Sequence, residues 1–126
     1  MTCFLDTQVL VWLCEGRTEK LSAAARATIE DSELAISPMV LLEVEYLHET
    51  KRIVKPPLAL LNHLQSQIGL QVRDHAFAAV IHTALFETWT RDPFDRIIVA
   101  QARCEGQVPL VTSDLKIREN YPAAVW

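Results

Sequence analysis

The sequence predicts an α/β fold in which a mainly parallel central sheet is flanked by helices in three layers. Short apolar stretches with strand character alternate with longer segments of helical pattern along the 126 residues, as in strand–helix–strand units. Half of the residues are hydrophobic, which is ample for one core. Only 3 residues are Gly, and this disfavours a loop-rich or all-β fold. We therefore expect a single domain over residues 1–126.

In the first half of the chain, the predicted helices begin at recognisable caps. Asp6 precedes a helix that begins at Thr7, and Ser22 precedes an Ala-rich helix. Ser37 and Pro38 provide a cap and a proline at the first helical position of a third helix. The predicted strands are residues 2–5 and 34–36, and the predicted helices are residues 7–15, 23–31, 38–49 and 57–66.

The second half continues the alternation and ends in a short strand. Residues 69–72 and 108–111 have strand character, as does the tail 124–126. Helices are predicted for residues 76–86 and 93–106, and Asp114 begins a short helical turn. In parallel sheets of this kind, functional residues gather at the carboxyl ends of the strands.

Four acidic residues stand where an apolar segment gives way to the next element: Asp6, Glu43, Asp95 and Asp114. Asp6 and Asp114 directly follow predicted strands, so each is either a helix cap or a functional group. For Asp6 these two interpretations are about equally probable on capping statistics alone. All four acids are expected at one edge of the sheet.

Glu43 and Asp95 are less easily explained as caps. On a helix Glu43 is surrounded by apolar neighbours such as Met39 and Leu47, whereas Glu45 faces solvent. Asp95 shares a helix face with apolar residues and is also directed inward. A buried carboxylate without a partner is costly, so each needs a basic side chain or a metal ion. Asp92 precedes a proline and is interpreted as a cap or supporting residue.

A cluster of carboxylates has a definite chemical use. The acids repel one another and raise one another's pKa unless a cation is present. Mg²⁺ and Mn²⁺ take hard oxygen ligands, keep several waters and bridge to substrate phosphates. The four acids therefore predict a Mg²⁺ or Mn²⁺ site for phosphodiester chemistry.

With these residues identified, the chain resembles a PIN domain, and in particular a VapC-type toxin ribonuclease. The most specific segment is Asp92-Pro93-Phe94-Asp95-Arg96, followed by an apolar run and Gln101-Ala102. Weaker likenesses occur in the expected order at residues 4–7, 36–43 and 110–114, so the resemblance extends from residue 2 to about residue 120. Pro38 is one departure, in a segment where family members often carry a small residue.

The resemblance implies a PIN-like fold, a metal-dependent endoribonuclease activity and two kinds of protein partner. Such toxins cleave RNA, commonly form homodimers and are silenced by a co-encoded antitoxin of a type II toxin–antitoxin pair. By the same resemblance, Asp6, Glu43, Asp95 and Asp114 would be the catalytic, metal-binding acids. The supporting residues would be Thr112, Asp92, Thr7 and Ser37.

Charge and cysteine content limit the remaining interpretations. The formal net charge of −4 is not that of a protein that grips nucleic acid by bulk charge. Basic residues beside the expected site could hold RNA phosphates or pair with the acids, and we leave both possibilities open: Arg91, Arg96, Lys116 and Arg118. Three cysteines without paired spacing, no secretion signal and no membrane-span pattern favour a cytoplasmic protein that does not use a membrane.

Two other classes of protein fit parts of the pattern. A receiver-type phosphoacceptor domain has similar length, α/β alternation and an acidic Mg²⁺ site. It would carry an acidic pair after the first strand and a lysine after a late strand, whereas this chain has Asp6 alone and Asp114 in the later position. A PIN-like binding module without activity is the other alternative, and the intact acids argue against it.

Overall fold

The central sheet consists of five parallel strands in the order β3-β2-β1-β4-β5. This computed structural model describes residues 1–126. The first strand lies in the middle of the sheet, where it pairs with β2 on one side and β4 on the other. The strands are β1 (Thr2–Leu5), β2 (Glu33–Ile36), β3 (Gln71–Val72), β4 (Leu110–Val111) and β5 (Ala124–Val125).

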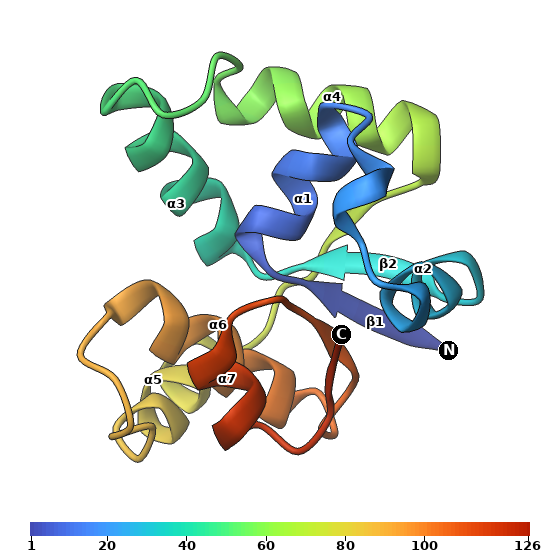
Figure 1. The fold of residues 1–126 in the computed structure, drawn as a ribbon. Helices are drawn as coiled ribbons and strands as arrows, with labels where there is room; N and C mark the ends of the chain where they lie inside the picture. Colours follow the sequence, from blue (N-terminus) through green and yellow to red (C-terminus); the bar gives the residue numbers. More distant parts are fainter.

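Seven α-helices and one 3₁₀ turn connect the strands. In Figure 1, α1, α3 and α4 lie on one side of β1 and β2, and α5, α6 and α7 lie on the other. The prediction of a parallel sheet flanked by helices is therefore confirmed. The helical elements are α1 (Thr7–Cys14), η1 (Thr18–Lys20), α2 (Ala23–Glu30), α3 (Pro38–Glu49), α4 (Pro57–Ile68), α5 (Phe77–Ala84), α6 (Pro93–Cys104) and α7 (Leu115–Asn120).

The predicted caps explain why these helices begin where they do. Asp6 accepts a hydrogen bond from the Thr7 backbone N–H, and Ser22 accepts one from the N–H of Ala25. Ser37 accepts one from the N–H of Met39, with a proline at the start of α3. Each cap satisfies an N–H that has no partner within the helix. The helix starts are thus determined locally by the sequence.

Three strands, β3, β4 and β5, are shorter than predicted, and one 3₁₀ turn was not predicted. Gly69, expected to begin a strand, instead ends α4 in the left-handed conformation with φ of 66°. Such a conformation has no steric cost for glycine. As a result β3 begins only at Gln71, and β4 begins at Leu110 rather than at residue 108.

The core places the carboxyl ends of the central strands at one edge. Cys3, Phe4 and Leu5 in β1 are essentially fully buried. Leu5 pairs with Val111, so Asp6 and Thr112, which follow these two residues, lie side by side at the carboxyl ends of β1 and β4. The Asp6 N–H donates to the Val111 carbonyl at 3.0 Å, which extends the β1–β4 ladder to the first acid. No helix has both the length and the apolar character needed to cross a membrane.

Candidate metal centre

The acidic residues surround one polar pocket of about 330 Å³ at the edge of the sheet. Five of its lining residues carry a carboxylate, and none carries a basic side chain. Only one lining residue is hydrophobic. The complete lining is Asp6, Thr7, Gln8, Glu43, Leu47, Asp92, Asp95, Ser113 and Asp114. The structure therefore brings the four predicted acids together and adds Asp92 to them.

The strands β1 and β4 supply one side of the pocket. Asp6 Oδ2 accepts a hydrogen bond of 2.7 Å from the Thr112 hydroxyl, and Asp6 Oδ1 accepts one of 2.9 Å from the Thr7 N–H. The same Thr112 hydroxyl accepts a hydrogen bond of 3.0 Å from the Asp114 N–H. Asp114 Oδ1 in turn caps α7 by accepting from the Ile117 N–H. A single buried hydroxyl therefore links two of the acids.

Helix α3 supplies Glu43, the acid predicted to point inward. Glu43 Oε1 accepts a short hydrogen bond from the Thr7 hydroxyl at the start of α1. The side chain is half-buried and no ion pair in the structure includes it. Thr7, predicted as a supporting residue, thus fixes one oxygen of Glu43 and leaves the other without a protein donor.

The first turn of α6 supplies Asp92 and Asp95. Asp92 is exposed, and its Oδ1 caps α6 by accepting from the Phe94 N–H at 2.9 Å. Asp95 lies one turn along the helix and is half-buried. It accepts no hydrogen bond from another protein group. Asp92 therefore has the capping role predicted for it, with one oxygen left over, and Asp95 has both oxygens available.

The tightest group of potential ligands differs from the predicted four. Glu43, Asp92 and Asp95 each offer a carboxylate oxygen, and these oxygens lie within 4.8 Å of one another. Asp6 and Asp114 line the same pocket without belonging to that group. Asp92 thus lies closer to the centre of the cluster than a purely capping residue would.

The crowding of carboxyl groups changes their protonation. Burial, reinforced by the neighbouring carboxylates and opposed by the Thr7 hydrogen bond, raises the pKa of Glu43 to about 7. Burial and the neighbouring carboxylates raise the pKa of Asp95 to about 8. Burial also raises the pKa of Asp6, against the hydrogen bonds from Thr112 and Thr7. Such a cluster is fully ionised at neutral pH only when a cation compensates the charge.

The other predicted supporting residues have mixed placements. Thr112 and Thr7 contact the acids directly, as described above. Ser37 is buried at the start of α3 but does not line the acidic pocket. Gln8 and Ser113 do line it and were not predicted. Their only signal in the sequence is adjacency to Thr7 and Asp114, which is too weak to identify them.

The four basic residues considered beside the site divide into two groups. The Arg96 guanidinium donates to the carbonyls of Ala84 and Leu85 at 3.1–3.2 Å, which satisfies the end of α5. Arg91 is exposed and donates to a carbonyl in its own loop at 3.2 Å. Lys116 and Arg118 are exposed on α7, which begins at Asp114. None of the four forms an ion pair with an acid of the pocket.

These features together describe a pocket of carboxylate oxygens, the ligand type that divalent cations prefer, on a parallel α/β fold. A family model for the PIN domain matches residues 3–121, which is nearly the whole chain. The chain therefore belongs to the PIN domain family. The receiver-type alternative is accordingly ruled out as a description of this domain.

Within the family, the chain is similar to a ribonuclease, VapC22 of Mycobacterium tuberculosis. The two are 33% identical over 131 residues, and the aligned region covers 99% of this chain and 98% of the relative. The similarity thus extends over the full length of both chains.

Solved structures of toxin–antitoxin complexes share the fold. A complex from Klebsiella pneumoniae contains a chain with a TM-score of 0.68 and 19% identity, covering 98% of this chain and 96% of that one. A chain of DNA-bound VapBC from Salmonella typhimurium has a TM-score of 0.64 and 22% identity, and the match covers 98% of this chain and 95% of that one. A chain of VapBC2 from Rickettsia felis, bound to a promoter DNA fragment, has a TM-score of 0.63 and 20% identity. The match covers 98% of this chain and 96% of that one. At these identities the likeness establishes the fold.

Proposed function

We propose that this protein is a Mg²⁺- or Mn²⁺-dependent endoribonuclease that hydrolyses RNA phosphodiester bonds. It acts as the toxin of a type II toxin–antitoxin pair. The observation that carries the proposal is the pocket with five carboxylates and no basic side chain. Membership of the PIN family and full-length similarity to a ribonuclease support RNA as the substrate.

The residues present fit a small divalent cation. All donors in the pocket are hard oxygens, as Mg²⁺ and Mn²⁺ require. Glu43, Asp92 and Asp95 are close enough to share one ion, while Asp6 and Asp114 extend the acidic surface toward the strands. When bound, such an ion supplies the Lewis acidity that activates a water and neutralises charge on phosphate.

The chain's own residues determine how the carboxylates are presented. Thr112 and the Thr7 N–H hold both oxygens of Asp6, so that carboxylate cannot rotate freely. The Thr7 hydroxyl orients Glu43, and the helix start orients Asp92. These contacts fix the acids before substrate binds, which avoids the cost of ordering them during the reaction.

The proposal is tested with purified protein and a long RNA of mixed sequence. We expect cleavage in Mn²⁺ or Mg²⁺, no cleavage in EDTA, and recovery when the metal is restored. Expression of the wild-type chain without its antitoxin should slow bacterial growth. Metal binding without RNA cleavage at any protein concentration would instead favour the binding-module alternative.

Thr112 offers a prediction about metal-site support. Thr112→Val keeps the side-chain shape but removes the hydroxyl that links Asp6 and Asp114. We expect RNA cleavage to fall by about 10- to 100-fold, as is typical when a residue that orients a ligand is lost. Thr112→Ser keeps the hydroxyl and should retain most activity. Equal activity of the Val and Ser variants would contradict this role.

The exposed basic residues offer a prediction about RNA binding. On an Asp95→Asn background, which should prevent cleavage, Lys116→Ala and Arg118→Ala should each weaken RNA binding and reduce the salt dependence by about one unit of slope. Fluorescence anisotropy at several salt concentrations measures both quantities. Arg96→Ala should instead lower the melting temperature, because Arg96 satisfies carbonyls at the end of α5. If the two α7 variants bind RNA as tightly as the parent protein, Lys116 and Arg118 do not contact the RNA.

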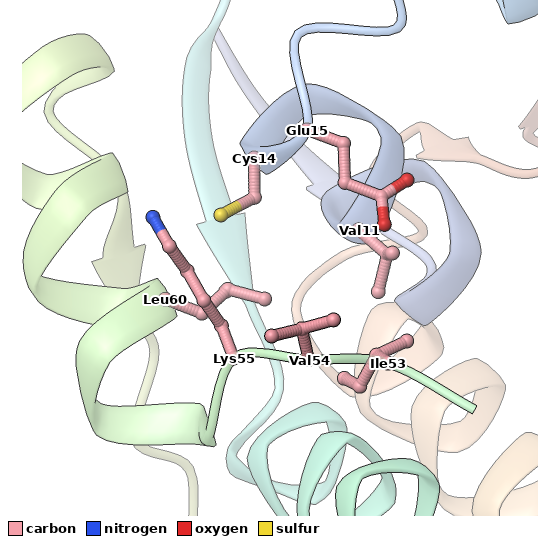
Figure 2. Close-up of a pocket in the computed structure, with 7 residues that line it drawn as sticks. All are labelled: Val11, Cys14, Glu15, Ile53, Val54, Lys55 and Leu60. Carbon is pink, nitrogen blue, oxygen red and sulfur yellow. The ribbon is translucent and has the colours of Figure 1, made fainter. Parts of the chain in front are cut away.

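The partners of the protein form part of the same proposal. The antitoxin occupies the apolar cavity of about 340 Å³ beside α1, where Val54 is 90% exposed. Figure 2 shows Val11 and Cys14 of α1 facing the segment before α4 across this cavity, with Glu15 just beyond the helix end. An antitoxin partner is supported by the chains of similar fold that were solved in toxin–antitoxin complexes, and its place at this cavity is supported by the exposed apolar lining. Val54→Asp should reduce copurification of the co-expressed neighbouring gene product, and an unaffected complex would place the antitoxin elsewhere.

We also infer a homodimer in the cytoplasm. Phe77 and Phe86, at the two ends of α5, are 70% and 73% exposed, which leaves an apolar surface for a second copy to cover. All three cysteines are free, as expected in a reducing compartment. Light scattering of the purified chain measures the oligomeric state, and a monomer at high concentration would contradict the dimer.

A further inference from the structure

A second charged cluster lies in the connection between α5 and α6, residues 85–92. This segment has an exposed beginning, with Leu85 at 60% and Phe86 at 73% exposure. The next residue, Glu87, is only 4% exposed, and Thr90 is 8% exposed. A carboxylate buried this deeply requires charged or hydrogen-bonding partners. The partners of Glu87 connect this segment to the rest of the domain.

Both oxygens of Glu87 are engaged by other side chains. Arg103 Nε, near the end of α6, donates to Glu87 Oε1 in a short ion pair. Trp89 Nε1 donates to Glu87 Oε2. Glu87 is thereby fixed to the far end of α6, and the chain then runs back along that helix to its first residue. The segment has a second anchor at Thr90, whose hydroxyl accepts from the Asp92 N–H at 3.1 Å.

Arg103 also holds the end of α7. Its Nη2 donates to the Asn120 carbonyl at 2.9 Å, and its guanidinium carbon lies 5.2 Å from the centre of the Tyr121 ring. Tyr121 is 1% exposed and donates its hydroxyl to the Val108 carbonyl. A single arginine therefore joins the 85–92 segment, α6 and α7, which lie together on one side of the sheet in Figure 1.

The segments that Arg103 joins are those that deliver acids to the pocket. The 85–92 segment ends at Asp92, α6 carries Asp95 in its first turn, and α7 begins at Asp114. Glu43 comes from α3 and forms no hydrogen bond or ion pair with Glu87 or Arg103. The Glu87–Arg103 pair is therefore placed to set the positions of Asp92, Asp95 and Asp114 relative to Glu43.

We propose that Glu87 and Arg103 form a positioning pair that holds Asp92 and Asp114 in place in the acidic pocket, so that Asp92 can share a divalent cation with Glu43 and Asp95. The inference rests on the proposed metal-dependent nuclease function and adds residues outside the pocket to it. Neither Glu87 nor Arg103 touches the metal or the RNA. Their effect is on the geometry of the acids, because removing Glu87 takes away the charged acceptor that holds the Arg103 guanidinium between the 85–92 segment and α7.

The test compares Glu87→Gln with a matched control at Glu105, which directly follows α6. Glu105→Gln removes an ion pair with His75 of 3.3 Å at the end of α6, but that pair touches neither α7 nor the 85–92 segment. Mn²⁺ affinity is measured by titration calorimetry well below the melting temperature of each variant. We expect Glu87→Gln to raise the Kd for Mn²⁺ by about tenfold, and Glu105→Gln to stay within about twofold of wild type.

RNA cleavage gives a second readout that a purely structural role would not change. Glu87→Gln should lose most activity at limiting Mn²⁺ and regain it at saturating Mn²⁺. If Glu87→Gln does not fold, Trp89→Phe removes only one donor to Glu87 and should raise the Kd by about threefold. Two results would overturn the inference: a lowered melting temperature with unchanged Kd, or equal behaviour of Glu87→Gln and Glu105→Gln.

The outcome also distinguishes the inference from the function on which it rests. If wild-type protein neither binds Mn²⁺ nor cleaves RNA, the proposed function fails and the positioning role fails with it. If wild type does both and the Glu87 variants match it, only the positioning role fails.

Discussion

Replacing Asp95 by Asn should reduce RNA cleavage by about a hundredfold or more while making the metal-free protein more stable. The loss of activity is expected because Asp95 has both carboxylate oxygens available in the acidic pocket. The gain in stability is expected because Asp95 is repelled by four neighbouring carboxylates. Activity on RNA and thermal unfolding in EDTA measure the two effects.

The opposite signs make this substitution informative. A variant that simply misfolds loses activity and stability together, whereas loss of a crowded ligand separates them. Glu45→Gln provides the control, since Glu45 lies on α3 beside Glu43 but does not line the pocket. It should leave cleavage and melting temperature close to wild type. Full activity in Asp95→Asn would remove this carboxylate from the mechanism.

The second large effect is a loss of stability with rising pH in the absence of metal. The pKa values of Glu43 and Asp95 in the folded protein, about 7 and about 8, are far above the ordinary carboxyl range. Between about pH 4 and pH 8 the folded state therefore holds protons that the unfolded chain has released. Under that condition the free energy of unfolding decreases as the pH rises.

The size of this effect and its reversal by metal are measurable. Each unit of pKa shift corresponds to about 1.4 kcal/mol, but partial exposure of both carboxyls screens the repulsion. We expect a loss of about 2 kcal/mol between pH 5.5 and pH 8.5 in EDTA. Mn²⁺ should restore more stability at pH 8.5 than at pH 5.5, because bound carboxylates must be deprotonated.

Urea unfolding at the two pH values, with and without Mn²⁺, gives the required free energies. In Glu43→Gln the pH dependence should be smaller, since one of the two shifted carboxyls is gone. A metal-free stability that stays constant or rises over this range would show that the acids are not crowded as described.

The fold was predictable because nearby residues in the sequence determine where most helices begin. Ser37 and Pro38 fix the start of α3, and Asp92 fixes the start of α6, through side-chain bonds to nearby backbone N–H groups. Gly69 was misjudged although its role is also local, because a glycine directly after a helix is a common helix end. Its neighbour Leu70 is buried, and the apolar pattern read as a strand, whereas the backbone there completes the end of α4.

The acids that line the candidate site could be predicted from the sequence, but the distances between them could not. Helical periodicity directed Glu43 and Asp95 inward, and the structure places both in the pocket. The proximity of Asp92 to Glu43 depends on how α3 packs against α6, which no local pattern encodes. The role of Glu87 was equally hidden, because its partner Arg103 is sixteen positions away in sequence. Contacts of this kind are set by tertiary packing.

The pairing of β1 with β4 has a consequence for how the protein is made. Thr112 and Asp6 are 106 positions apart in sequence, yet their hydrogen bond orients one of the acids that line the pocket. During synthesis the first strand emerges early and has no β4 to pair with until residues near 114 have been translated. The full set of acids that line the pocket cannot assemble before then, because Asp114 follows β4. We therefore expect that a growing chain on the ribosome spares the messenger RNA that encodes it until nearly all of the PIN domain has been made.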